Sequence, residues 1–121
     1  MELSHPAKKN RDDKEMFADI VQAILSVMGD DVTEIILYGS VARGDNTWES
    51  DVDIAVLTTK HYNWREKKEF YDSLWEYDWK YNTIFSIVPI FLDEFNALKN
   101  ERLFYRNIVK DGIILWTKQA A

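Results

Sequence analysis

At 121 residues, with 46% hydrophobic and 30% charged residues, the chain has the size and composition of a single folded globular domain. Lysine and arginine total 15 against 21 aspartate and glutamate, and this net charge of -6 argues against an extended nucleic acid or an anionic membrane as partner. The sequence has no cysteine, which excludes disulfides and thiolate metal sites, and it has no apolar signal or membrane-spanning run, so we expect a cytoplasmic protein.

The first part of the chain predicts a tail and a helix. Residues 1–12 are polar, contain Pro6 and show no periodicity, so we expect a mobile N-terminal tail before a single domain over residues 13–118. From Asp13 onward, apolar residues recur at helical spacing as far as Met28, and Gly29 stands where a helix would stop.

Two short β-rich segments follow this helix. Residues 33–38 (TEIILY) predict a buried strand that ends in a tight turn at Gly39 and Ser40. Residues 51–58 (DVDIAVLT) predict a second strand whose two faces differ. One face carries Val52, Ile54 and Val56, and the other carries Asp51, Asp53, Ala55 and Leu57.

Residues 64–81 predict one long helix with two aromatic stripes. The first stripe is spaced to pack on the sheet and consists of Phe70, Leu74, Tyr77 and Tyr81. The second stripe lies on a neighbouring face and consists of Trp64, Tyr71, Trp75 and Trp79. For this second stripe we favour a wide core face, and the alternative is a patch that binds a partner.

The remaining segments complete one sheet. Residues 83–91 (TIFSIVPIF) predict a third strand, in which Pro89 favours a sheet edge or a bulge. Short helices are predicted over residues 92–98 and 103–110, the second stopped by Asp111 and Gly112. Residues 113–116 predict a closing strand.

Gly39 and Ser40 could form a backbone cradle for an anion at the end of the first strand. Glycine allows backbone N–H groups to approach an anion closely, and a helix that starts there adds partial positive charge. The Ser40 hydroxyl could donate to the same oxygens. A Gly-Ser pair after a strand is by itself most often a plain turn, so the hypothesis depends on what lies beside it.

Asp51 and Asp53 are the acids that could lie beside this turn. On a solvated face they would be ordinary surface charge, but Ala55 and Leu57 continue the same face and indicate that it is covered further along. Adjacent like charges raise each other's proton affinity unless a cation lies between them. Hard oxygen ligands on a rigid strand, completed by triphosphate oxygens, suit Mg²⁺.

The joint pattern resembles a known family signature. Residues 39–44 (GSVARG), followed by residues 50–53 (SDVD), resemble the signature of the DNA polymerase beta-like nucleotidyltransferase superfamily, in its minimal nucleotidyltransferase (MNT) branch. The spacing from Ser40 to Asp51 and the close of the chain over residues 104–116 are also similar, so the resemblance covers most of the chain from the first helix onward. It implies an α/β (α+β) fold with a mixed central β-sheet flanked by helices.

The resemblance also implies a role for each matching residue. By position, Gly39 and Ser40 bind the nucleotide phosphates, and Asp51 and Asp53 are the catalytic carboxylates that bind the divalent metal. For Arg43 two roles stay open, a phosphate contact or a structural ion pair. The implied substrate is a nucleoside triphosphate, ATP, together with Mg²⁺.

One position departs from the family pattern. Active members commonly add a third carboxylate from a later strand, which helps to remove the proton from the attacking hydroxyl. The aligned residue here is Ser86, which cannot act as that base. The carboxylates nearby in sequence are more simply interpreted as solvated helix or turn residues: Asp72, Glu76, Asp78 and Asp93. Within the motif, we expect Gly44 to terminate a helix and Ser50 to orient the neighbouring aspartate.

The leading functional hypothesis is an enzyme that moves a nucleoside monophosphate, AMP from ATP, onto a hydroxyl of a protein or a small molecule. Small domains of this type are often encoded beside a helical HEPN-type partner, as the antitoxin of a toxin–antitoxin pair. One alternative is a catalytically weak binding module that neutralises such a partner by contact, which Ser86 favours and the pair of aspartates disfavours. Another is transfer to a small molecule such as an aminoglycoside, for which a homo-oligomer would have to complete the substrate site.

Overall fold

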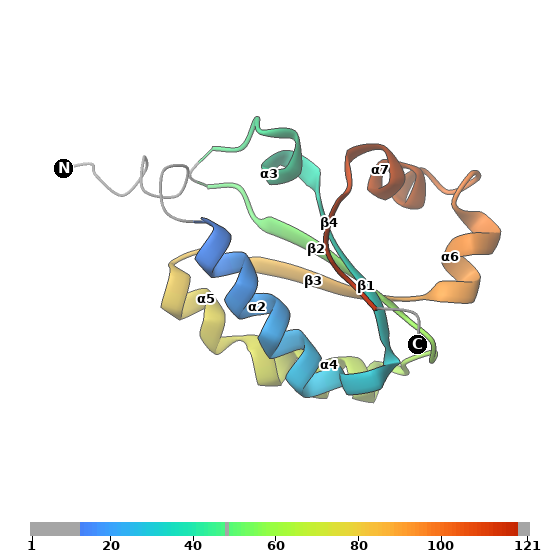
Figure 1. Ribbon diagram of the computed structural model, residues 1–121, viewed down its shortest axis with the longest axis horizontal. Helices are drawn as coiled ribbons and strands as arrows, with labels where there is room; N and C mark the ends of the chain where they lie inside the picture. The colour runs from blue at the N-terminus through green and yellow to red at the C-terminus, as the bar shows by residue number, and fades with distance from the viewer. Residues whose placement is uncertain (1–12, 48, 119–121) are drawn as a thin grey trace.

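The computed structural model describes residues 13–47 and 49–118, and its elements are shown in Figure 1. The predicted mobile tail over residues 1–12 lies outside the described residues. In chain order the elements are α2 (Asp13–Met28), the 3-10 helix η1 (Gly29–Asp31), β1 (Val32–Tyr38), α3 (Gly39–Arg43), β2 (Val52–Thr58), α4 (Trp64–Leu74), α5 (Glu76–Tyr81), β3 (Phe85–Phe91), α6 (Leu92–Leu98), α7 (Leu103–Asp111) and β4 (Ile113–Thr117). Among the described helices, none combines the length and the apolar character needed to span a bilayer.

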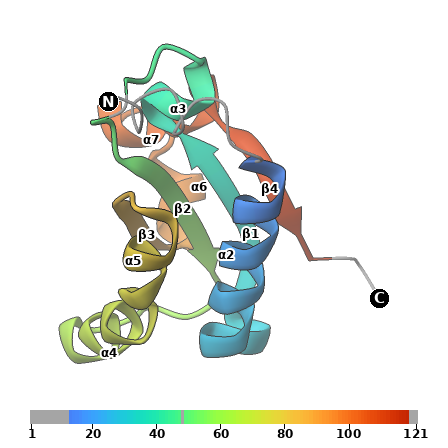
Figure 2. The ribbon, with the colours of Figure 1, turned by 90° about the vertical axis from the view of Figure 1, so that its left-hand side faces the viewer.

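Four strands form one sheet in the order β3-β2-β1-β4 (Figure 2). Strand β1 pairs with β2 and with β4 in antiparallel orientation, whereas β2 and β3 run parallel. Helices α4 and α5 connect the parallel pair, because parallel neighbours need a crossover segment between them. The mixed sheet confirms the predicted fold class, and β3 lies at a sheet edge, as Pro89 indicated.

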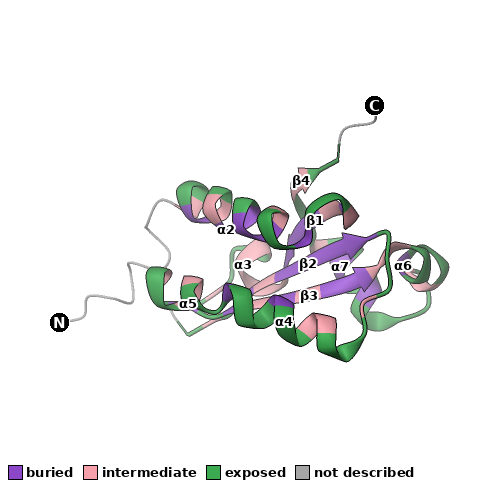
Figure 3. Ribbon diagram, turned by 90° about the horizontal axis from the view of Figure 1, so that it is seen from below, coloured by how far each residue is buried: buried purple, intermediate pink, exposed green. Residues whose placement is uncertain are grey.

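Strand β2 contributes to the cores on both faces of the sheet. Figure 3 shows that most of this strand is buried. Val52, Ile54 and Val56 are buried in one core with residues of α2 and α4. Ala55 and Leu57 are buried in the other core with residues of α6 and α7. A fully buried aliphatic side chain contributes about 1.5–3 kcal/mol, so this arrangement fixes the register and direction of β2. The predicted division of its faces is confirmed.

Helix α2 has the predicted bounds. Ile20 and Ile24 are fully buried on its core side. Directly after Met28, Gly29 adopts a φ of +64°, a left-handed conformation that glycine accommodates without a Cβ penalty. The helix therefore ends at the residue where the sequence predicted it to stop.

The predicted long helix is two helices in the structure, and this prediction was wrong. Helix α4 ends at Leu74 and α5 begins at Glu76, with Trp75 between them. A tertiary contact connects α5 to the start of β3. In this contact the Phe85 N–H donates to Asp78 Oδ1 at 3.0 Å. Because no glycine or proline marks the break, local sequence could not show it.

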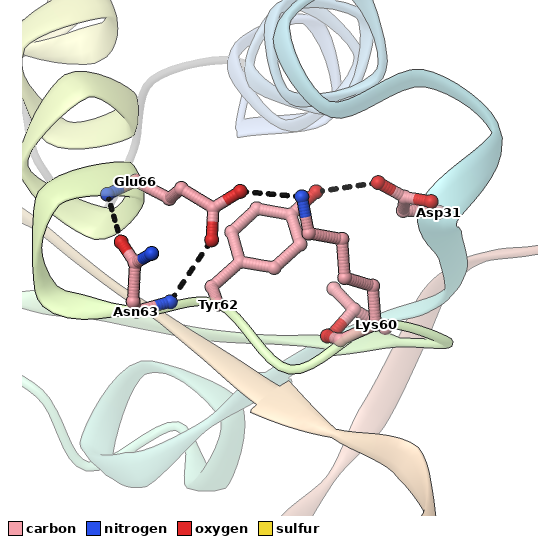
Figure 4. Close-up of polar contacts among 6 residues, drawn as sticks. Asp31, Lys60, Tyr62, Asn63 and Glu66 are labelled. Carbon is pink, nitrogen blue, oxygen red and sulfur yellow. Dashed lines mark hydrogen bonds and ion pairs between the residues drawn. The ribbon is translucent and has the colours of Figure 1, made fainter.

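Helix α4 begins with a capping box at the end of β2 that lies away from Asp53 (Figure 4). The Glu66 N–H donates to Asn63 Oδ1 at 2.8 Å, and the Asn63 N–H donates to Glu66 Oε1 at 3.0 Å. Lys60 forms an ion pair with the same glutamate. The polar groups at this helix start are thus satisfied by one another.

The two aromatic stripes over α4 and α5 have different environments. The first stripe packs on the sheet as predicted, with Phe70 and Leu74 buried and with Tyr77 and Tyr81 against the same core. The second stripe is exposed, by 73% at Trp64, 43% at Tyr71, 59% at Trp75 and 78% at Trp79. The favoured interpretation as a wide core face was therefore wrong, because all four side chains are exposed.

Candidate functional site

Two glycines in the left-handed conformation shape the turn after β1. Gly39, with φ +78°, begins the one-turn helix α3 directly after Tyr38. Gly44, with φ +81°, ends it, and its N–H donates to the carbonyls of Ser40 and Val41. The prediction that Gly44 terminates a helix is confirmed. Because the first N–H groups of a helix have no carbonyl partner within it, α3 presents donors where β1 stops.

The Asp53 carboxylate packs directly against Gly39. Tyr38 and Asp53 are register partners on the antiparallel strands β1 and β2, which brings the aspartate level with the glycine turn. A Cβ added at Gly39 would lie 2.3 Å from Asp53 Oδ2, closer than any real contact allows. A larger residue at position 39 would strain the backbone and displace the Asp53 carboxylate, and the predicted turn and the predicted acid therefore meet.

Asp51 and Asp53 are coupled electrostatically beside this turn. Asp51 is exposed immediately before β2, and Asp53 is half-buried. Burial raises the pKa of the Asp53 carboxyl and the charge of Asp51 raises it further, while Arg43 lowers it. The structure thus brings together both predicted carboxylates at the end of the sheet where Gly39 lies.

This pair of acids fits a hard divalent cation. Within residues 13–47 and 49–118, no group of three or more His, Cys, Asp or Glu side chains could hold a metal. Mg²⁺ is nevertheless commonly bound by one or two carboxylates, with substrate phosphates and water completing its shell. A half-buried carboxylate with a raised pKa would also gain from a neighbouring cation. Asp51 and Asp53 are the residues that would hold Mg²⁺.

Tyr38 is a neighbour of the site that sequence reasoning had treated only as the end of a strand. Its ring contacts Phe104 edge-on, with 5.8 Å between the ring centroids. Burial, and after it the charge of Asp53, raise the pKa of Tyr38 to about 12. The phenol therefore stays protonated at neutral pH and adds no negative charge beside the acids.

Arg43 forms the structural ion pair that was one of its two open roles. Its Nη1 lies 3.0 Å from Asp111 Oδ2, and its Nε lies 3.2 Å from Asp45 Oδ2. Both hydrogen bonds raise the pKa of the guanidinium, with Asp111 the larger cause. The pair joins α3 to α7, and a phosphate contact by Arg43 stays a prediction.

Ser50 closes the loop before β2 and was wrongly expected to orient Asp51. Its Oγ accepts a hydrogen bond from the Thr47 N–H at 2.9 Å, and its own N–H donates to the Thr47 carbonyl at 3.0 Å. Hydroxyl groups in tight turns commonly bond to the nearby backbone in this way. Ser50 therefore acts on Asp51 only by shaping the loop that leads to it.

Ser86 lies beside Asp53 on the neighbouring strand. The two residues are register partners in the parallel pair of β2 and β3. A carboxylate at this position would face Asp53 from the adjacent strand. The serine therefore leaves the site with one acid on β2, Asp53, and with Asp51 immediately before that strand.

Asp78 is a third carboxylate near the site, and its interpretation as a solvated residue was wrong. It is half-buried, and burial raises its pKa, the hydrogen bond from the Phe85 N–H lowers it, and the charge of Asp51 raises it. Asn82, with φ +50°, ends α5 in a left-handed turn that returns the chain toward Asp78. An asparagine after a helix is a signal for such a turn and could have indicated this proximity. Asp72, Glu76 and Asp93 are exposed, as expected.

Comparison with known families decides what this site belongs to. The family model described as polymerase beta, nucleotidyltransferase, matches residues 21–121. This chain belongs to the polymerase beta nucleotidyltransferase family. The match contains the glycine turn, Asp51 and Asp53, and it confirms the family indicated by the sequence pattern.

Two relatives of this nucleotidyltransferase come from Methanocaldococcus jannaschii, and both are named as protein adenylyltransferases. One is 32% identical over 72 residues, which are 60% of this chain and 73% of the relative. The other is 28% identical over 104 residues, which are 86% of this chain and 98% of the relative. Their names agree with the assignment of the family.

Solved structures show the same fold. A toxin–antitoxin complex with AMP-PNP has a chain that matches with a TM-score of 0.61 and 21% identity, over 85% of this chain and 74% of that one. A chain from a complex of a tri-AMPylated Shewanella oneidensis HEPN toxin with an MNT antitoxin matches with a TM-score of 0.59 and 18% identity, over 88% and 73%. At these identities the likeness shows the nucleotidyltransferase fold, as predicted.

Proposed function

We propose that this nucleotidyltransferase transfers AMP from ATP to a hydroxyl group of a protein, with Mg²⁺ held by Asp51 and Asp53. The observation that carries the proposal is the packing of the Asp53 carboxylate against Gly39, which leaves no room for a Cβ. This contact joins an anion-binding turn to a pair of acids. The relatives named as protein adenylyltransferases support AMP as the transferred group and a protein as its acceptor.

Each residue of the site has a defined task in this proposal. The backbone N–H groups at the start of α3 and the Ser40 hydroxyl would bind phosphate oxygens beside Gly39. Asp51 and Asp53 would hold Mg²⁺, which when bound neutralises phosphate charge and aligns the reacting oxygens. The protonated phenol of Tyr38 would line the buried side without repelling the phosphates.

The transfer step must also remove a proton. A bond forms between the acceptor oxygen and the α-phosphorus, the bond from that phosphorus to pyrophosphate breaks, and the hydroxyl proton passes to solvent water. Ser86, the register partner of Asp53, cannot accept this proton as a carboxylate would. We therefore expect transfer to be slower than in a site with three strand-borne carboxylates.

A HEPN-type protein is the partner that we propose for this chain, which would then act as an MNT antitoxin. The solved complexes with this fold include an MNT antitoxin bound to an AMPylated HEPN toxin. The exposed aromatic residues on α4 and α5 give this chain apolar surface that a partner could cover.

A second candidate is a binding module that neutralises such a partner by contact alone. Ser86 favours it, because a site used only for binding has no need of a third carboxylate. The raised pKa of Asp53 disfavours it, since a half-buried acid beside Asp51 has an unfavourable charge that contact with a protein does not require.

Labelled ATP distinguishes the two candidates. The chain would be incubated with ATP labelled on the α-phosphate, Mg²⁺ and the protein encoded by the neighbouring gene, which we expect to be of the HEPN type. We expect label on the partner, and Asp53→Asn should reduce the rate by roughly 100-fold, the usual effect of losing one group that stabilises charge in a transition state.

Asp30→Asn is the matched control. Asp30 is an exposed aspartate in η1, at the opposite end of β1 from Gly39, and its loss should leave the rate unchanged. Neutralisation of the partner by Asp53→Asn without any label would support the binding module. Label transfer that is equal in wild type and Asp53→Asn would contradict the proposed site.

A further inference from the structure

A groove between α4, α5 and β3 opens beside the nucleotide site. Its cavity of about 280 Å³ is lined by Tyr71 and Trp75 on one side and by residues of β3, including Ser86 and Ile87, on the other, with Asp78 also in its lining. Ser86 is the register partner of Asp53. One end of the groove therefore reaches the strand position next to the candidate catalytic carboxylate.

The strand that forms one wall of the groove has an open side. Within the described residues β3 is paired only with β2. The Val52 N–H donates to the Ile84 carbonyl at 2.8 Å, so the alternate residues Ile84 and Ser86 direct their backbone groups toward β2. Phe85 and Ile87 then direct theirs outward, as an unpaired strand edge that another extended chain can join.

The outward groups of β3 limit how such a chain could pair. Asp78 Oδ1 already accepts the Phe85 N–H at 3.0 Å. Pro89 has no N–H to donate. The Ile87 N–H and carbonyl lie between these two positions, and Ile87 is one of the residues that line the groove, so a short extended segment would pair with this residue.

The groove also has a chemical preference. Tyr71 and Trp75 are exposed aromatic side chains, and aromatic faces attract Arg and Lys side chains. The half-buried carboxylate of Asp78 lines the same groove, Asp51 is close enough to affect the pKa of Asp78, and the chain carries a net charge of -6. A cationic segment is therefore favoured, and a second copy of this acidic chain is disfavoured by like charge.

We propose that this groove binds the acceptor as an extended, cationic polypeptide segment along β3. An Arg or Lys of the segment lies against Tyr71 and Trp75, its backbone pairs with Ile87, and its hydroxyl side chain is directed past Ser86 toward Asp53. The inference rests on the proposed function, because it names the class of acceptor for the same site.

Peptide titration by NMR tests this proposal on the wild-type chain without ATP. The probe is a short Gly/Ser peptide that carries one Tyr flanked by Arg, and the control peptide has Glu in place of Arg. We expect the Arg peptide at millimolar concentration to shift the Trp75 indole signal and the Ile87 amide signal. The indole signals of Trp64 and Trp79, which do not line the groove, should stay in place.

A pair of variants sharpens the test. Trp75→Ala should weaken binding of the Arg peptide by about fivefold, the effect of one exposed cation–π contact. Trp79→Ala removes an aromatic side chain that is more exposed but outside the groove, and it should leave the affinity unchanged. The wild-type spectra still decide the question if either variant fails to fold.

Several outcomes would overturn the proposal. These are an absence of peptide binding, equal shifts with the Glu peptide, and shifts that leave Trp75 and Ile87 unaffected. A dimer in solution that is lost in Trp75→Ala would assign the groove to a second copy instead. The titration contains no nucleotide, so an absence of peptide binding would contradict the proposed groove without contradicting the proposed nucleotide transfer. An absence of label transfer would contradict the proposed function without changing the peptide result.

Discussion

The two ends of the β1–β2 pair both carry acidic side chains, and the ends differ in how the acids nearest the strands are partnered. At the end near α4, Tyr62 donates to Asp31 at 3.0 Å, and Glu66 is bonded to Lys60 and to the Asn63 N–H (Figure 4). These partners lower the pKa of Glu66, with Lys60 the largest cause.

The other end places like charges together. Asp53 is half-buried near Asp51 and packs against Gly39, and its pKa is raised by burial and by its neighbour. A carboxylate with a raised pKa in the folded state opposes folding when it is ionised, whereas one with a lowered pKa favours it. The ionised Glu66 therefore stabilises the fold, whereas the ionised Asp53 destabilises it unless a cation is bound beside it.

The largest expected effect comes from the glycine at the second end. Gly39→Ala and Gly44→Ala both place a Cβ on a backbone with positive φ, which costs roughly 1–2 kcal/mol of stability in each. Only the Gly39 variant also collides with Asp53, because a Cβ at Gly44 meets nothing within 4 Å. Calorimetric titration with Mg-ATP should show affinity reduced by roughly 10- to 100-fold in Gly39→Ala, the range seen when support of a metal ligand is lost.

Gly44→Ala is the internal control for that measurement. It should bind Mg-ATP like the wild type, although the positive φ at Gly44 makes it lose thermal stability as well. Equal nucleotide affinity in both variants would mean that the contact between position 39 and Asp53 has no part in binding.

At the end near α4, the expected effect is on stability alone. Asn63→Ala removes the N-cap of α4, whose Oδ1 accepts the Glu66 N–H, and should lower the free energy of unfolding by about 1 kcal/mol. Denaturant unfolding measures this loss, and Mg-ATP affinity should be unchanged. A loss of nucleotide affinity as large as in Gly39→Ala would show that the two ends are not separate.

The smallest effect is a gain of stability at the acidic end. Asp53→Asn removes an ionised carboxyl with a raised pKa and should increase the free energy of unfolding by roughly 0.5 kcal/mol at neutral pH, the low end of the gain from removing an unfavourable surface charge. The gain is fully present above the raised pKa and is lost as the pH falls below the ordinary value of 3.8, because wild-type Asp53 is then protonated in both states.

Denaturant unfolding of both proteins across this pH range checks the prediction. If Asp53→Asn is less stable than the wild type at neutral pH, the carboxylate has a structural partner and the contrast between the two ends is wrong.

The sequence was sufficient where a regular period determines the structure. The alternation along residues 51–58 predicted both the two buried faces of β2 and the position of Asp53 on one of them, because side-chain direction in a strand is fixed by period. The site then followed from the register of Tyr38 with Asp53 in the antiparallel pair, which places Asp53 beside Gly39.

The remainder depended on contacts between distant segments. The break at Trp75 has no local breaker and is accompanied by the hydrogen bond between Asp78 and Phe85. Exposure of the second aromatic stripe could not be read from spacing either, because both stripes have helical periodicity and the sheet covers only one of them. Asp78 came near Asp51 through the turn at Asn82.

Binding of ATP with Mn²⁺ in place of Mg²⁺ is the most direct test of the nucleotide site. It shows whether the cation and the nucleotide bind beside Asp51 and Asp53. A paramagnetic ion broadens the NMR signals of nearby amides. We predict that substoichiometric Mn-ATP broadens the amides of Gly39, Asp51 and Asp53 and leaves those of Tyr62 and Glu66 sharp. Broadening confined to Tyr62 and Glu66, or the same small broadening throughout the chain, would contradict the assignment of the nucleotide site.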